Sequence, residues 1–198
     1  LVSQYKLGEY TPEIAKSWTS NSTQTEWVFT FRENLTYSDG STLTPISYEQ
    51  SLLRSAKIMK TKNSKSGVFE HIIGFDQLDS YSKNLPGLIS TPTTLTFKLD
   101  TPMPHFLDKI SFGLYAAAHQ SMYESTTGKW LAEKNIVSSG PYKIVEWTNE
   151  HLLLKLRTDY PQEIVHKKPI NEIDISWNKS SNLKSTLKVN GKLTLPPQ

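Results

Sequence analysis

Alternating apolar and polar positions between residues 27 and 40 predict a strand followed by a tight turn. In the segment WVFTFR, residues 27–32, aromatic side chains occupy every second position, which is the period of a strand with one buried face. The pattern stops at Ser38-Asp39-Gly40. An Asp side chain bonds the backbone that follows it, and Gly reaches positive φ without steric cost, so this tripeptide predicts a turn.

A helix is predicted directly after this turn. Thr44 is a suitable N-cap, and Pro45 suits the first helical position because the N–H that it lacks would have no partner there. Apolar residues then recur at helical spacing, with charged residues available for the solvent-facing side. The apolar positions are Tyr48, Leu52, Ala56 and Met59.

The same reasoning predicts further elements along the chain. Strands are expected at residues 95–99, 142–147, 152–156 and 173–177, the second and third joined by a turn at 148–150. Shorter expectations are a helical turn within 11–18, a helix at 105–110, a buried strand at 112–118, a helix at 127–134 and a weak helical pattern through Leu183 and Leu187. Together they predict an α+β fold with mainly antiparallel or mixed sheets.

Composition narrows the function classes. The 198 residues include 22 basic and 19 acidic side chains, and the net charge of +3 is too small and dispersed to indicate a nucleic-acid partner. Because cysteine is absent, disulfides, thiolate metal sites and cysteine nucleophiles are excluded. No apolar run approaches the roughly 18–20 residues that cross a bilayer. The first ten residues lack the basic and apolar regions of a signal peptide.

Catalytic and metal-binding motifs are not visible in the sequence. None of the five histidines stands in a HExxH or HxH pattern, and no GxSxG, P-loop or GxGxxG motif occurs. No cofactor, metal site or catalytic residue is therefore predicted. The 5 Trp and 9 Tyr residues have two interpretations, packing in the core and sheets, which composition favours, or a cleft that holds a ligand.

A longer pattern resembles the solute-binding proteins of peptide-type ABC transporters (family 5, oligopeptide- and dipeptide-binding proteins). The segment AKSW at 15–18, the strand end Phe29 to Arg32, and the turn Ser38-Asp39-Gly40 with Leu43-Thr44 are similar to motifs of this family. Two positions differ, because Tyr37 stands where the family usually has Trp and Ser47 replaces the usual acidic residue.

Two further segments resemble the same family in the same order. Residues 95–99 followed by PMPHFL at 102–107 are similar to the family's strand and proline-rich element, and Ser138-Ser139-Gly140-Pro141-Tyr142 is similar to its GTGPY motif. Tyr160 matches the family's Tyr-Trp pair, with Pro161 in place of the Trp.

The resemblance implies a fold and a domain organisation. Residues 1–198 are expected to form part of the first lobe of a class II, cluster C periplasmic binding protein, with mixed or antiparallel sheets and flanking helices. Residues of about 26–134 would form the extra subdomain of this family. Residues 1–25 and 135–198 would contribute to the main sheet of the lobe. The second lobe of such a protein would lie outside this chain.

The resemblance also implies a function. The parent protein would bind a peptide or similar solute between two lobes in the periplasm, or at the cell surface as a lipoprotein, and pass it to an ABC permease. The alternatives are a ligand-sensing domain of a transcriptional regulator or receptor, and, less favoured, an enzyme. The isolated lobe is expected to bind peptide weakly or not at all, and strand edges left exposed by the missing lobe could pair to form a dimer.

One residue is predicted to face the ligand. Phe69 follows the long helix, at a position where members of the family often place an aromatic side chain at the cleft. The competing interpretation is that Phe69 is an ordinary core residue. The sequence does not identify the ligand.

Overall fold

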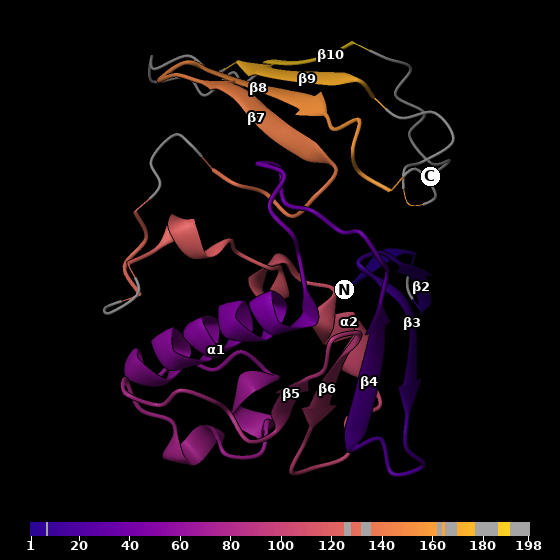
Figure 1. The fold of residues 1–198 in the computed structure, drawn as a ribbon, viewed down its shortest axis with the longest axis vertical. Coiled ribbons are helices and arrows are strands. Elements are labelled where there is room, and N and C mark those ends of the chain that lie inside the picture. The colour runs from indigo at the N-terminus through magenta and orange to yellow at the C-terminus, as the bar shows by residue number, and fades with distance from the viewer. Residues whose placement is uncertain are drawn as a thin grey trace.

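The computed structural model describes residues 1–6, 8–124, 128–131, 136–161, 164, 170–176 and 186–190. These residues form three antiparallel sheets, a long helix and several short helical turns, as Figure 1 shows. The strands are β1 (Val2–Lys6), β2 (Glu9–Pro12), β3 (Ala15–Ser20), β4 (Glu26–Phe31), β5 (Leu88–Ser90), β6 (Thr94–Lys98), β7 (Tyr142–Trp147), β8 (His151–Leu156), β9 (Glu172–Ser176) and β10 (Thr186–Asn190). The helices are α1 (Pro45–Thr61) and α2 (Phe106–Ile110), and the 3₁₀ turns are η1 (Phe69–His71), η2 (Phe75–Gln77), η3 (Gly113–Tyr115) and η4 (Gln120–Met122).

The first large sheet has the strand order β3-β4-β6-β5 and carries the core on one face. In β4 the buried positions alternate with half-buried ones, as the sequence pattern predicts. Phe106 of α2 covers this face and packs against three aromatic rings, with centroid distances of 5.3 Å to Trp27, 6.1 Å to Phe29 and 5.1 Å to Phe97. This aromatic cluster is the centre of the core.

Helix α1 begins where the sequence predicts. The Thr44 hydroxyl accepts a hydrogen bond from the Ser47 N–H at 3.1 Å, and the Thr44 N–H donates to the Ser47 hydroxyl at 2.9 Å, so the two residues form a reciprocal capping box. Ser47 therefore fulfils the role that a Glu or Gln usually has in this motif. The buried face of the helix packs on β5 and β6.

The second large sheet has the strand order β10-β9-β8-β7 and lies at the other end of the molecule (Figure 1). The hairpin of β7 and β8 confirms the prediction for residues 142–156. Strand β9 confirms the strand predicted at 173–177 as far as residue 176, and residue 177 lies outside the described residues. All strand pairs among the described residues are antiparallel. The predicted α+β class with antiparallel sheets is thus confirmed.

Four local predictions are wrong where the structure describes the residues. Residues 9–12 and 15–20 form strands instead of a helical turn, because β1 and β4 supply partners for their backbone groups. The apolar run 112–118 contains the 3₁₀ turn η3 and no strand. Trp130 forms an antiparallel bridge with Tyr123 where a helix was expected, and residues 125–127 and 132–135 of that region lie outside the described residues.

The fourth wrong prediction concerns the C-terminal tail. Leu187 lies in β10, which pairs with β9, so the predicted helical pattern does not hold at this position. Leu183 lies outside the described residues. Pairing with an adjacent strand satisfies a row of backbone groups that a weakly amphipathic helix would have to satisfy alone.

The strand pairing bears on the predicted division into subdomains. Residues 15–20, which that division groups with 135–198, pair with β4 in the first large sheet. Strands β1 and β2 form a separate two-stranded sheet. The division of the whole protein at about residues 26 and 134 stays a prediction.

Candidate functional site

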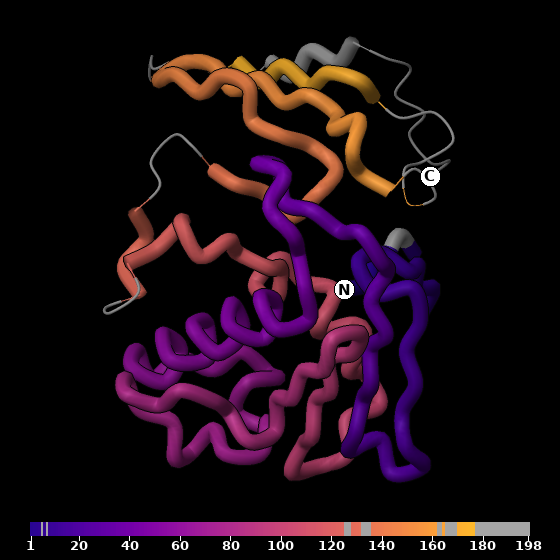
Figure 2. Tube along the Cα trace, in the orientation of Figure 1, coloured from indigo at the N-terminus to yellow at the C-terminus, as the bar shows by residue number. Residues whose placement is uncertain are grey.

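The two large sheets are connected by the loop between β4 and α1, which rises from the first sheet to meet the start of the second (Figure 2). Ser38 in this loop and Ser138 before β7 form two hydrogen bonds. The Ser38 N–H donates to the Ser138 carbonyl at 2.9 Å, and the Ser138 N–H donates to the Ser38 hydroxyl at 2.9 Å. The SDG turn and the SSGPY segment, which stand out separately in the sequence, are therefore neighbours in space.

Arg157, the residue directly after β8, forms further hydrogen bonds at the same junction. Its side chain is buried, with 2% of the residue exposed. The guanidinium donates to the Gly140 carbonyl at 3.1 Å, to the Thr36 hydroxyl at 2.6 Å and to both Asp159 carboxylate oxygens at 3.2 and 2.8 Å. Hydrogen bonding to Arg157 lowers the pKa of Asp159 to about 2, so this carboxylate stays ionised at neutral pH.

A hollow of about 300 Å³, here called the junction pocket, opens beside this joint. Its walls come from three parts of the chain that are far apart in sequence. These are the start of β1 with Glu13 and Ile14, the segment from Ile110 to Ala116 together with Tyr48, and the residues Ser139, Gly140, Pro141 and Tyr160 of the second sheet region. Ligand sites favour such meeting points of substructures.

A second hollow of about 300 Å³, here called the turn pocket, shares part of its wall with the first. It is lined by Ser66, Asp108, Lys109, Phe112, Leu114 and Tyr115. Phe112 and Tyr115 line both hollows, so they form the partition between them. The two hollows together are the candidate binding site.

Tyr115 is held rigidly in this partition. Its hydroxyl donates to the Ser66 carbonyl at 3.0 Å, and its carbonyl accepts a 2.5 Å hydrogen bond from the Tyr48 hydroxyl. Burial raises the pKa values of both phenols, so they remain neutral hydrogen-bonding groups. A ligand entering either hollow would therefore meet a preformed wall.

Phe69, the residue predicted to face the ligand, lies behind this wall. It is fully buried in the core, and its ring centroid is 5.2 Å from that of Tyr115. Its burial supports the core interpretation, while contact with a ligand stays a prediction. Tyr115, Phe112 and Arg157 were not predicted as site residues. An isolated arginine at the end of an apolar hairpin is the sequence signal that could have identified Arg157.

Asp108 at the edge of the turn pocket is ionised and already engaged. Its carboxylate accepts a 2.6 Å hydrogen bond from the Gln4 amide and lies 3.4 Å from His105 Nδ1. Hydrogen bonding between Tyr10 and Asp108 raises the pKa of Tyr10 to about 12 and lowers that of the carboxyl group. Lys109 lines the same pocket without an ion pair to any described residue, so its ammonium is available to an acceptor on a ligand.

Residues that resemble catalytic groups do not form a catalytic arrangement. Ser41 donates to Asp39 at 2.6 Å and lies 3.3 Å from His119 Nε2, so the serine stands between the other two residues. In a hydrolase triad the histidine must stand between serine and carboxylate to remove the hydroxyl proton. Here the Ser41 hydroxyl bonds the carboxylate directly, and the group stabilises the SDG turn.

A larger hollow lies elsewhere in the described part of the chain. A groove of about 760 Å³ follows the outer face of α1 next to residues 120–123 and Gly128. Arg54 stacks over Tyr123 there, 4.2 Å from the ring centroid. This groove is bordered mainly by one helix and adjoins residues 125–127, which are not described. The junction and turn pockets are the better candidate because three separate parts of the chain meet there.

The described residues meet the requirements of neither a metal site nor a membrane-spanning helix. No cluster of three His, Cys, Asp or Glu side chains with the arrangement of a metal site is found among them. No described helix has both the length and the apolarity needed to cross a membrane.

Comparison with known proteins gives a consistent result. A family described as bacterial extracellular solute-binding proteins, family 5 Middle, matches residues 9–195. The periplasmic oligopeptide-binding protein OppA of Salmonella typhimurium is 28% identical over 158 residues, which are 77% of this chain and 29% of OppA. The periplasmic murein peptide-binding protein MppA of Escherichia coli is 27% identical over 169 residues, which are 81% of this chain and 30% of MppA.

Solved structures show the same relationship. A periplasmic oligopeptide-binding protein of Borrelia burgdorferi (OppAIV) is 26% identical, with a TM-score of 0.69 over 88% of this chain and 35% of that protein. The unliganded open form of MppA has a TM-score of 0.71 at 23% identity, which shows a common fold. The chain spans about 30% of the length of the curated relatives that it matches. It is part of a periplasmic-binding-protein fold and belongs to the bacterial extracellular solute-binding proteins, family 5.

Proposed function

We propose that this chain is part of the first lobe of a substrate-binding component of an ABC transporter for peptides or similar solutes. The observation that carries the proposal is the family match over residues 9–195, together with 28% identity to an oligopeptide-binding protein. The lobe contributes the walls of the junction and turn pockets, and a second lobe closes over the solute by rotation about a hinge. The reaction is binding and release, so no catalytic residue is required.

The chemistry of the two pockets suits this role. A peptide carries amide N–H and carbonyl groups, and each one buried without a partner costs about 1–3 kcal/mol. Ser66, Lys109 and Ser139 place hydroxyl, ammonium and main-chain groups at the walls, and the Phe112 ring offers apolar surface. In the full-length protein the partners would be the solute and an ABC permease, and the location would be the periplasm or, for a lipoprotein, the cell surface.

Calorimetry on the full-length protein tests the proposal. Peptides of two to five residues are expected to bind with micromolar or tighter dissociation constants, while residues 1–198 alone bind them weakly or not at all, because the contacts from the second lobe are missing. Absence of peptide binding by the full-length protein would contradict the proposed function. Micromolar binding by residues 1–198 alone would contradict the two-lobe mechanism.

A receptor is the second candidate function. The structure of the pheromone receptor PrgZ has a TM-score of 0.67 to this chain at 18% identity, so the fold is shared with a receptor. The sequence next to this chain in the full reading frame distinguishes the two. An upstream signal peptide or lipoprotein cysteine favours transport, and a fused helix-turn-helix domain favours a regulator.

A further inference from the structure

The turn formed by η3 and the two residues before it holds two apolar side chains out of the core. Phe112 is 72% exposed and Leu114 is 45% exposed, although the neighbouring Ile110 and Tyr115 are each only 2% exposed. Leaving large apolar side chains in water forgoes the stabilisation that their burial would give. An ordered element that exposes two of them together marks a surface that another molecule covers.

The turn is fixed by its own backbone. The Phe112 N–H donates to the Lys109 carbonyl at 3.2 Å, the Tyr115 N–H to the Phe112 carbonyl at 3.0 Å, and the Ala116 N–H to the Gly113 carbonyl at 3.1 Å. The Tyr115 side chain then anchors the turn to Ser66. The Phe112 ring is therefore presented from a preorganised position, which lowers the entropy cost of binding.

The pockets beside the Phe112 ring indicate which kind of molecule covers it. Phe112 lines both the junction pocket and the turn pocket, and each hollow has a volume of about 300 Å³. A flat protein surface laid over the turn would leave both hollows unfilled. An extended chain with projecting side chains fills two hollows that share a wall and places its main-chain groups near the polar walls.

We propose that Phe112 and Leu114 contact an apolar side chain of the bound peptide and make the protein select peptides that carry one. The proposal rests on the proposed function and adds the specificity of the site. The ligand side chain lies against the Phe112 ring, and Lys109 in the same pocket is a donor for a carbonyl or carboxylate of the ligand. Specificity arises because a polar side chain at this place would lose its water without gaining a partner.

Paired tripeptides test the proposal on the full-length protein. In Ala-Ala-Ala, Leu or Ser replaces each position in turn, which gives three Leu/Ser pairs, and calorimetry measures each dissociation constant. The wild-type protein is expected to favour Leu over Ser by about tenfold or more at one position at least. Phe112→Ala should reduce that ratio to near one, and Phe112→Leu should retain most of it because an apolar group is still present.

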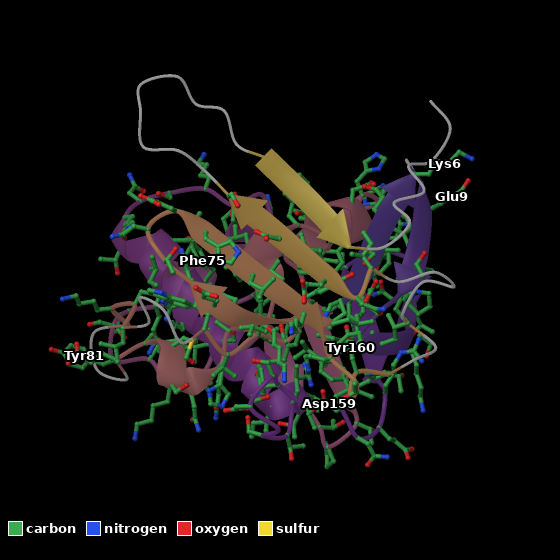
Figure 3. All side chains as sticks on the ribbon, turned by 90° about the horizontal axis from the view of Figure 1, so that it is seen from above. Lys6, Glu9, Phe75, Tyr81, Asp159 and Tyr160 are labelled. Atoms are coloured by element: carbon green, nitrogen blue, oxygen red, sulfur yellow. The ribbon has the colours of Figure 1, made fainter. Side chains whose placement is uncertain are left out.

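Tyr81→Ala is the matched control. Tyr81 is an aromatic residue that is 89% exposed, and Figure 3 shows it at the edge of the molecule away from Asp159 and Tyr160, which lie together near the junction. This variant should keep the wild-type ratio. Thermal unfolding midpoints of all variants should match that of the wild type, because none of the replaced side chains belongs to the core.

Three results would overturn the inference. The first is an unchanged Leu/Ser ratio in Phe112→Ala. The second is equal weakening of both members of each pair, which would indicate that Phe112 contacts the second lobe. The third is failure of the wild-type protein to bind any of the tripeptides and longer peptides, which would contradict the proposed function itself and is recognised before any variant is measured.

Discussion

The Arg157 guanidinium donates a 2.6 Å hydrogen bond to the hydroxyl of Thr36, a residue 121 positions earlier in the chain. Thr36 belongs to the loop that follows the first large sheet, and Arg157 follows a strand of the second. The Thr36 hydroxyl in turn donates to the Asp159 carboxylate at 3.0 Å. One buried cation with its hydrogen-bond partners therefore connects the two sheets whose junction forms the candidate site.

Removing this cation should weaken the junction. Arg157→Ala is expected to lower the free energy of unfolding by about 3 kcal/mol, because several charge-assisted hydrogen bonds are lost at a buried position. Arg157→Lys should recover only part of this, since a single ammonium cannot reach Thr36, Gly140 and Asp159 as the planar guanidinium does. Urea unfolding measures both variants, with Lys143→Ala on the exposed side of β7 as the control. Wild-type stability in Arg157→Lys would contradict the role assigned to the guanidinium geometry.

The same pair predicts a dependence of stability on acid pH. Asp159 has a pKa of about 2 in the folded protein, lowered from 3.8, first by hydrogen bonding to Arg157. A lowered folded-state pKa means that the stabilisation is fully present above about pH 4 and is lost as the pH falls toward 2. Because the Asp159 side chain is 52% exposed, solvent screening keeps this contribution small.

Urea midpoints measured between pH 5 and pH 2 test this prediction. Asp159→Asn should be less stable than the wild type at pH 5, and the difference should shrink toward pH 2. A difference that stays constant over this range would show that the Asp159 charge does not stabilise the fold.

Two phenylalanines close in sequence should differ strongly in how much their truncation destabilises the protein. Phe106 is fully buried among three aromatic rings, so Phe106→Ala should lower the free energy of unfolding by about 3–5 kcal/mol through lost burial and a cavity. Phe112→Ala removes a mostly exposed ring and should change it by less than about 0.5 kcal/mol. Thermal or urea unfolding compares the two, and similar losses in both would contradict the exposure of Phe112.

Phe69→Ala separates the two interpretations of the predicted ligand-facing residue. Because Phe69 is fully buried behind Tyr115, the variant should lose about 3–5 kcal/mol of stability. Peptide affinity of the folded full-length variant gives the second measurement. Unchanged affinity would establish Phe69 as a core residue, and a loss larger than that of other core truncations would support contact with the ligand.

Sequence reasoning succeeded where a pattern is local. The alternation at residues 27–32, the cap at Thr44 and the hairpin of residues 142–156 each depend on neighbours within a few residues, and the structure confirms them. It was wrong for the strands at 9–12 and 15–20 and for Leu187, because a strand exists only when a partner strand lies beside it, and the partner is not part of the local pattern.

The candidate site depended on tertiary structure to a greater extent. Residues 112–118 have the composition of a buried strand, yet Phe112 points to solvent, because only the packing of α2 and the anchoring of Tyr115 decide which side of the turn faces the core. The junction pocket joins residues 1–3, 110–116 and 139–141. The sequence of any one of these segments does not show that the other two lie beside it in the folded protein.

The sequence by itself therefore determined the fold class, the main helix and its cap, and the family, since these follow from short-range backbone preferences and from motifs in a fixed order. Only the tertiary structure decided which motifs meet. It brought the SDG turn to the SSGPY segment through Ser38 and Ser138, buried Arg157 between the sheets and left Phe112 exposed. Burial and long-range hydrogen bonding depend on the whole arrangement of the chain, so a local pattern cannot specify them.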